Sequence, residues 1–134
     1  MLPEWFELRK KVETSKSGLH GADLSYAKLM HADLSDANLK QADLSDAYLM
    51  RANLAGADLR EADLSRAIIS EADLKGADLE GAELCDAYLN GADLSGVRNL
   101  TCDQLELANF DRETKFPENI IITWDADGGW ECGD

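Results

Sequence analysis

The sequence has no long apolar run and no excess of basic residues, and its first residues form no continuous apolar segment. No stretch approaches the roughly 20 consecutive apolar residues of a membrane-spanning helix. The first residues, MLPEWFELRKK, contain no apolar core of an export signal. The formal net charge of −14 disfavours nucleic acid and anionic membranes as partners, because both attract basic proteins. We therefore predict a cytoplasmic protein that binds neither nucleic acid nor membrane.

Cysteine is scarce, and its spacing excludes the common zinc motifs. Cys85, Cys102 and Cys132 are the only three cysteines, and C-x-x-C pairs are absent. We interpret all three as free thiols. The alternative is a disulfide, which would require two Cα atoms within roughly 7 Å and an oxidising compartment.

A repeat of five residues dominates what is present. The stretch ADLSDANLKQADLSDAYLMRANL, residues 32–54, returns alanine and leucine at every fifth position. In a strand this period would send successive leucines to opposite faces. In an α-helix it would rotate each leucine by about 140° from the last and leave no apolar stripe. A short extended piece followed by a turn lets every leucine point inward, so the pattern predicts an all-β solenoid.

The array covers residues 17–96 as sixteen units, each centred on a leucine except for Ile69. An alanine precedes nearly every centre by two positions and is small enough to lie against the wall of the next coil. Glycine occupies the last position of six units, whereas other units carry Asp, Arg or Glu there, which indicates more than one turn type. The predicted structural core includes Leu24, Leu34, Leu44, Leu54, Leu64, Ile69, Leu74 and Leu84.

Tandem A-[D/N]-L-x-x units resemble the pentapeptide-repeat family. The resemblance implies a right-handed quadrilateral β-helix with four units in each coil. Sixteen units would then form about four coils, and the column would be about 19 Å tall at the usual spacing between strands.

A break in the pattern argues for four sides independently of the family. The residue before each centre is Asp, Asn or Glu, except at the initial Gly18 and at four positions spaced by twenty: Lys28, Tyr48, Ile68 and Tyr88. A coil of twenty residues places these four in one column, with Met30 and Met50 beside them. We call this predicted interaction surface the tyrosine face; it comprises Lys28, Met30, Tyr48, Met50, Ile68 and Tyr88.

The other three faces carry ladders of carboxylates and amides. The Asp23 face has Asp23, Asp43, Asp63 and Glu83; the Asp33 face has Asp33, Asn53, Asp73 and Asp93; the Asn38 face has Asn38, Asp58 and Asp78. Like charges one strand apart should raise the pKa of some of these carboxyls. A flat ladder does not converge on one point as calcium ligands do, so we predict no metal site.

Three occupants of the tyrosine face are consistent with the sequence. The tail of the chain could cover it through Ile120, Ile121, Ile122 and Trp124. A second copy could bind there as a weak homodimer. A different protein is the third alternative, because an exposed apolar strip on a soluble protein usually meets something.

Both open ends of a solenoid need caps. Residues 1–16 form the predicted N-terminal cap, with a helix at about 3–13 whose Trp5, Leu8 and Val12 make one apolar stripe. Residues 97–118 form the predicted C-terminal cap, with a short helix at about 102–109. Thr101 and Gln104 have the spacing of a capping box at its start. We expect residues 119–134 to form a partly mobile tail.

The sequence supplies surfaces for binding but no recognisable catalytic group. No nucleophile and base have a familiar spacing, and no glycine-rich phosphate loop is present. We predict a non-enzymatic scaffold or interaction module without a cofactor, which presents one semi-apolar face and three acidic faces to an unidentified protein. The family resemblance implies an alternative, a DNA mimic that binds the topoisomerase gyrase. A height of about 19 Å, or roughly six base pairs, disfavours it.

Overall fold

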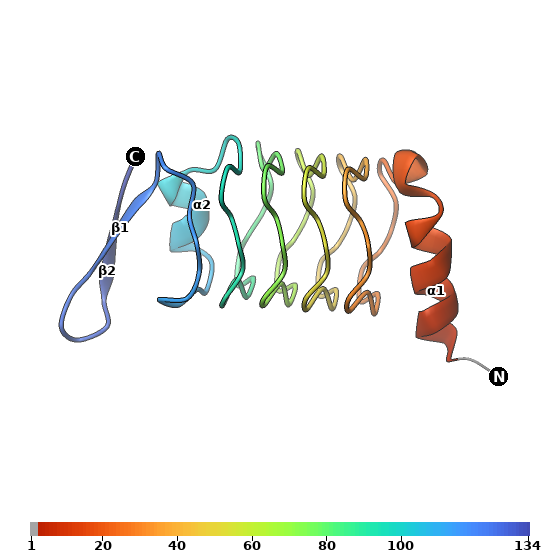
Figure 1. Ribbon diagram of the computed structural model, residues 1–134, viewed down its shortest axis with the longest axis horizontal. Helices are drawn as coiled ribbons and strands as arrows, with labels where there is room; N and C mark the ends of the chain where they lie inside the picture. The colour runs from red at the N-terminus through yellow and green to blue at the C-terminus, as the bar shows by residue number, and fades with distance from the viewer. Residues whose placement is uncertain (1–2) are drawn as a thin grey trace.

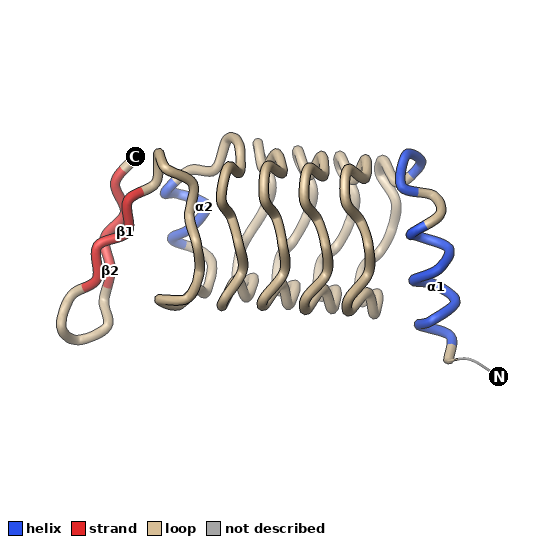
Figure 2. The backbone as a smooth tube through the Cα atoms, viewed as in Figure 1, coloured by secondary structure: helices blue, strands red, loops and turns tan. Residues whose placement is uncertain are grey.

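The computed structural model describes residues 3–134 as a column of stacked coils with a helix at one end and a β-hairpin at the other (Figure 1). The elements are α1 (Glu4–Glu13), the 3-10 helix η1 (Lys16–Gly18), α2 (Cys102–Glu106), β1 (Ile121–Trp124) and β2 (Trp130–Gly133). Between η1 and α2 the chain alternates turns with isolated bridges, which Figure 2 draws as loop. Residues 1–2 of the predicted N-terminal cap lie outside the described residues.

Residues twenty apart are neighbours in adjacent coils. Tyr48 bridges Ile68 and Ile68 bridges Tyr88, both in parallel, and the same offset recurs on the other three sides. The N–H of Leu29 donates to the carbonyl of Tyr48 at 2.8 Å, and the N–H of Tyr48 donates to the carbonyl of Ala27 at 2.9 Å. Each coil therefore uses four five-residue units, one for each side, and the predicted four-sided column is confirmed.

The centre of each unit fills the axis of the column. Leu54 and Ile69 are fully buried, and so is the alanine two positions before each of them, Ala52 and Ala67. A central side chain thus packs among the centres of its own and neighbouring coils. All the centres that the sequence analysis assigned to the core are buried: Leu24, Leu34, Leu44, Leu54, Leu64, Ile69, Leu74 and Leu84.

One turn conformation closes all sixteen units, so the prediction of several turn types was wrong. The last residue of each unit has a positive φ, for example 60° at Glu61 and 71° at Gly76. The alanine that follows donates its N–H to the preceding central carbonyl, as Ala27 does to Leu24 at 3.1 Å. This hydrogen bond holds even charged residues in a left-handed conformation that glycine adopts at no steric cost.

Helices α1 and η1 together cover two of the four strand edges at the N-terminal end of the column. The Glu13 carboxylate accepts a hydrogen bond from the N–H of Asp33, and the carbonyl of Lys16 accepts one from the N–H of Asn38, both at 2.8 Å. Within residues 3–134, the N–H groups of Asp23 and Lys28 have no such partner.

The far end of the column begins with α2. The capping box predicted at Thr101 and Gln104 is present, since each residue accepts a hydrogen bond from the backbone N–H of the other. The Gln104 side chain also donates to the carbonyls of Leu79 and Ala82, at 2.8 and 3.0 Å. The helix ends at Glu106, earlier than the predicted residue 109, and remains attached to the coil beneath it.

The tail forms a β-hairpin, so the prediction of a partly mobile tail was wrong for residues 121–133. Strands β1 and β2 pair antiparallel, with Ile122 opposite Cys132. A disulfide joins Cys132 to Cys102, whose Cα atoms are 5.7 Å apart. The prediction of three free thiols was therefore wrong for this pair, and only Cys85 is a free, exposed cysteine. The sequence did not predict this disulfide, because the tail lies outside the five-residue repeat and its position relative to Cys102 could not be derived from the spacing.

Candidate functional site

The tyrosine face is a single column of side chains on one side of the molecule. Tyr48 is 37% exposed and Tyr88 is 45% exposed, and the half-buried Ile68 bridges both. Lys28 is exposed at the N-terminal end of the column. The two methionines predicted to lie beside this column, Met30 and Met50, are half-buried.

The tail does not cover this face, which corrects one of the three predicted alternatives. Strands β1 and β2 lie beyond α2 at the C-terminal end of the column (Figure 1). Ile120 is buried in the core and Ile121 is 61% exposed. Trp124 packs edge-to-face on Phe110, with ring centroids 5.8 Å apart. The apolar residues of the tail therefore close the end of the column and leave Tyr48 and Tyr88 open.

Two ion pairs flank the tyrosine face, one along each edge. On the edge shared with the Asp23 face, Arg66 donates to Asp46 at 3.1 Å. This partner raises the pKa of Arg66. On the opposite edge, Arg51 pairs with Glu71 in the next coil. Both edges are thus neutralised near the tyrosines, and the face combines apolar groups with balanced charge.

The carboxylates of the Asp23 face are held by serines two residues further along the chain. The Ser25 hydroxyl donates to Asp23 at 2.7 Å, and the Ser45 hydroxyl donates to Asp43 at 2.6 Å. The hydrogen bond from Ser25 lowers the pKa of Asp23. The expected rise in pKa is therefore wrong for Asp23, because the hydrogen bonds from the Ser25 hydroxyl and N–H outweigh the opposing effect of burial.

The same pairing extends to the Asp33 face. The Ser35 hydroxyl, followed by its N–H and the Lys16 ammonium, lowers the pKa of Asp33 to about 2. Lys75 lies 3.5 Å from Asp73 and 3.9 Å from Asp93, so cations interrupt this ladder too.

The Asn38 face is charge-balanced, which corrects the prediction of three acidic faces. The Arg60 guanidinium donates to both oxygens of Asp58 and lowers the pKa of that carboxyl to about 2. Asp78 is only 7% exposed, accepts from the Asn99 amide at 2.9 Å and has Arg98 3.9 Å away. Arg60 lies two residues beyond Asp58 in a second outward column, whereas Arg98 continues the column of Asp58 and Asp78, and neither belongs to the predicted ladder.

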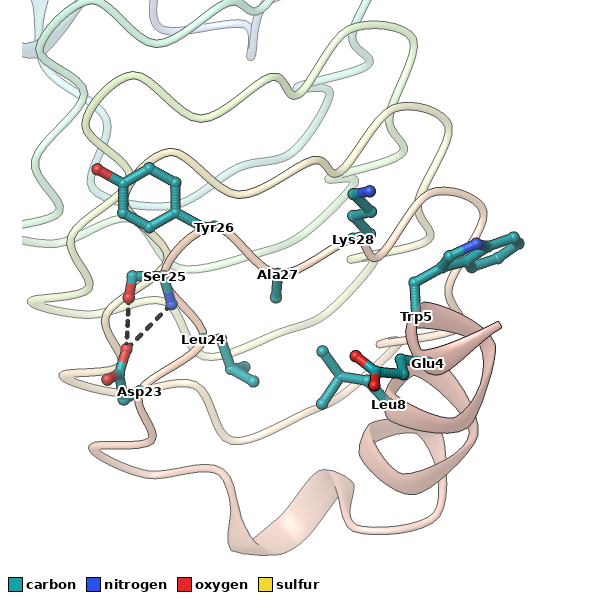
Figure 3. A pocket seen from close by; sticks show the side chains of 9 residues that line it. All are labelled: Glu4, Trp5, Leu8, Asp23, Leu24, Ser25, Tyr26, Ala27 and Lys28. Carbon is teal, nitrogen blue, oxygen red and sulfur yellow. Dashed lines mark hydrogen bonds between the residues drawn. The ribbon is translucent and has the colours of Figure 1, made fainter. Parts of the chain in front are cut away.

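A pocket of about 620 Å³ lies between α1 and the first coil, beside the N-terminal end of the tyrosine face. In Figure 3 Leu8 and Leu24 point toward one another across it, and Lys28 lies at its rim. The pocket adjoins the strand edge that α1 leaves without hydrogen-bond partners. Its lining residues are Glu4, Trp5, Leu8, Asp23, Leu24, Ser25, Tyr26, Ala27 and Lys28.

Residues 3–134 contain neither a cluster of metal ligands nor a membrane-spanning helix. No group of three or more histidine, cysteine, aspartate or glutamate side chains is arranged to hold a metal ion in this part of the chain. No helix there has both the length and the hydropathy needed to cross a membrane.

The sequence of the repeat array matches the model of a known protein family. The model described as pentapeptide repeats matches residues 27–66 and 67–98, in eight copies. The chain belongs to the pentapeptide-repeat family. Pentapeptide-repeat proteins are right-handed quadrilateral β-helices, and the twenty-residue register described above is that of a four-sided coil. A sequence comparison with curated proteins finds no match to this pentapeptide-repeat protein.

Solved structures of the same family are similar to the chain. Rfr23 from the cyanobacterium Cyanothece 51142 is 37% identical, with a TM-score of 0.48; the match covers 67% of this chain and 64% of Rfr23. A pentapeptide-repeat protein from Nostoc Pcc 7120 is 37% identical over 84% of this chain and 85% of its own, with a TM-score of 0.46. One from the thylakoid lumen of Arabidopsis thaliana is 28% identical over 86% and 74%, with a TM-score of 0.49.

Proposed function

We propose that this pentapeptide-repeat protein is a rigid, non-enzymatic interaction module that binds a protein through the tyrosine face. The observation that carries the proposal is the line of Tyr48, Ile68 and Tyr88, which is partly exposed on an otherwise polar column. Tyrosine is enriched at protein interfaces, because it buries a large apolar ring and keeps a hydroxyl for hydrogen bonding.

Rigidity supports binding in this arrangement. The backbone on both sides of Tyr48 is hydrogen-bonded to the coils before and after it. A side chain fixed at its root has less freedom to lose, and immobilising a flexible interface side chain costs roughly 0.5–1.5 kcal/mol. The tyrosine face is therefore preorganised for a flat, mainly apolar partner surface.

The alternative of a DNA mimic that binds gyrase has less support. Such a mimic needs an extended array of uncompensated negative charge. Arg60 and Arg98 compensate the carboxylates of the Asn38 face, and only the Asp23 face keeps an unbroken ladder. The distribution of charge favours recognition through apolar contacts over imitation of a phosphate backbone.

Site-specific photocrosslinking in the source cells tests the proposal. A photoreactive phenylalanine analogue at Tyr88 should yield a discrete crosslinked protein, whereas the same analogue at the exposed Asn53, on the Asp33 face, should not. The double variant Tyr48→Glu/Ile68→Glu, with the analogue kept at position 88, should lose the product. Its melting temperature must stay near that of the unsubstituted protein for the comparison to count. Equal crosslinking from positions 53 and 88 would contradict the proposal.

A further inference from the structure

We propose that the partner of the tyrosine face is the tyrosine face of a second copy of this chain, with the two columns antiparallel. The inference rests on the proposed function, because it names the occupant of the same surface. A twofold axis lies in the interface, perpendicular to both columns, midway between the layers of Tyr48 and Ile68.

The tyrosine face combines exposed apolar side chains with balanced charge, and both favour self-association. If two copies met through their Asp23 faces, one ladder of carboxylates would lie against another. The central column of the tyrosine face holds one cation, Lys28, and no carboxylate. The pairs Arg66–Asp46 and Arg51–Glu71 balance its edges. Two strongly acidic molecules therefore meet less repulsion here than through the Asp23 face, and an interface gains specificity when opposite charges face one another.

The axis places complementary groups opposite one another in the centre of the interface. Each layer of one copy faces a different layer of the second, so Tyr48 lies against Ile68 of the second copy. Lys28 then lies against the ring of Tyr88 of the second copy, an arrangement that suits a cation–π contact. Aromatic and aliphatic side chains in contact supply the apolar burial that drives association.

The two edges are complementary in the same register. A perpendicular axis brings each edge against the identical edge of the second copy, running in the opposite direction. Asp46 therefore faces Arg66 of the second copy, and Arg51 faces Glu71 of the second copy. The intramolecular pairs become parts of four-charge networks, and no like charges are placed directly opposite one another.

Two alternative registers fail on charge. Parallel columns related by an axis along their length place Lys28 against Lys28 of the second copy. An antiparallel register centred on Ile68 places Arg66 against itself and Asp46 against Asp86. The chosen register avoids both of these like-charge contacts and is complementary along both edges and the central column.

The small area of the face limits the affinity of the dimer. About four layers at 4.8 Å give a height of about 19 Å, so each copy buries well below the roughly 800 Å² that a standard stable interface buries on each partner. We therefore expect a weak dimer that forms with rising concentration and dissociates on dilution.

A charge-swap experiment by sedimentation equilibrium tests both the dimer and its register. The wild-type protein should shift from monomer to dimer between micromolar and millimolar concentration. R66D and D46R, measured separately, should each remain monomeric, because like charges then oppose along one edge. An equimolar mixture of the two should recover the dimer, because the acidic edge of one chain faces the basic edge of the other. The double variant D46R/R66D should also dimerise.

The controls separate this inference from the function on which it rests. Lys75→Glu, on the Asp33 face, should leave the association unchanged, and circular dichroism should show the same fold for every variant. A wild-type protein that stays monomeric at millimolar concentration overturns the inference, as does a mixture that stays monomeric while the wild type dimerises. If the photocrosslink from position 88 then joins a different protein, the proposed function stands without the homodimer; if no crosslink forms, both fail.

Discussion

Cys102, the first residue of α2, is joined by a disulfide to Cys132 in β2, thirty residues further along the chain. The bond ties the hairpin to the cap of the column at a point where Phe110 also packs against Trp130, with ring centroids 4.7 Å apart. The tail is thus part of the folded end.

Removing this disulfide should destabilise the protein. Closing a loop of about thirty residues lowers the entropy of the unfolded chain and contributes roughly 3–4 kcal/mol in the loop-entropy model. Cys102→Ser/Cys132→Ser should therefore unfold at a lower urea concentration than the oxidised wild type. Cys85→Ser is the matched control and should change little, since Cys85 is exposed and free. Identical midpoints for oxidised and reduced wild-type protein would contradict the expectation.

A second prediction isolates the cost of the left-handed turn residue. A Cβ built on Gly76 meets no atom within 4 Å, but the φ of this residue is +71°. Gly76→Ala should therefore lower the free energy of unfolding by about 1 kcal/mol through backbone strain alone. Gly18 has the same free space without a positive φ, so Gly18→Ala should be neutral or slightly stabilising. Chemical denaturation of both variants measures the difference, and equal stabilities would show that the turn is not strained.

A third prediction concerns the axis of the column. Leu54 is fully buried, so Leu54→Ala should cost about 2–5 kcal/mol through lost burial and the cavity left behind. Leu107 is 58% exposed, and Leu107→Ala should change stability by no more than about 0.5 kcal/mol. Equilibrium unfolding in urea compares the two. Similar losses in both variants would mean that the centre of the column is not its core.

The column could be predicted because its sequence repeats, whereas the parts outside the repeat could not. Leu54 and Tyr48 could be placed because a period of five fixes the inward residues, and a spacing of twenty fixes the columns. The positive φ of Glu61 could not be predicted, because a charged residue at the last position of a unit suggested a different turn type from that of the units ending in glycine. The hairpin depends on Ile122 meeting Cys132 and on Phe110 meeting two tryptophans, and such distant contacts leave no local pattern. The cations of the Asn38 face could have been placed from the sequence, because the same spacing of twenty aligns Arg60 with Lys40 and Arg98 with Asp78.

Acid should unfold the protein as its paired aspartates become protonated. The pKa of Asp33 and that of Asp58 are both about 2 in the folded protein, below the value of about 3.9 in an unfolded chain. The unfolded state therefore binds more protons between these values, and the free energy of unfolding falls as pH falls. The stabilisation is fully present above about pH 4 and is lost progressively as the pH falls through about 2.

Asp58→Asn tests this account at a single residue. The variant loses the charged partner of Arg60, so it should be less stable than the wild type at neutral pH. The difference should shrink between about pH 4 and pH 2, because over this range the unfolded wild-type chain binds a proton at Asp58 that the folded protein does not yet bind. Glu106→Gln is the control: Glu106 is exposed and makes no side-chain hydrogen bond or ion pair with residues 3–134, so its curve should run parallel to that of the wild type. A difference between Asp58→Asn and wild type that stays constant down to pH 2 would show that Arg60 does not hold the Asp58 carboxylate in its charged form.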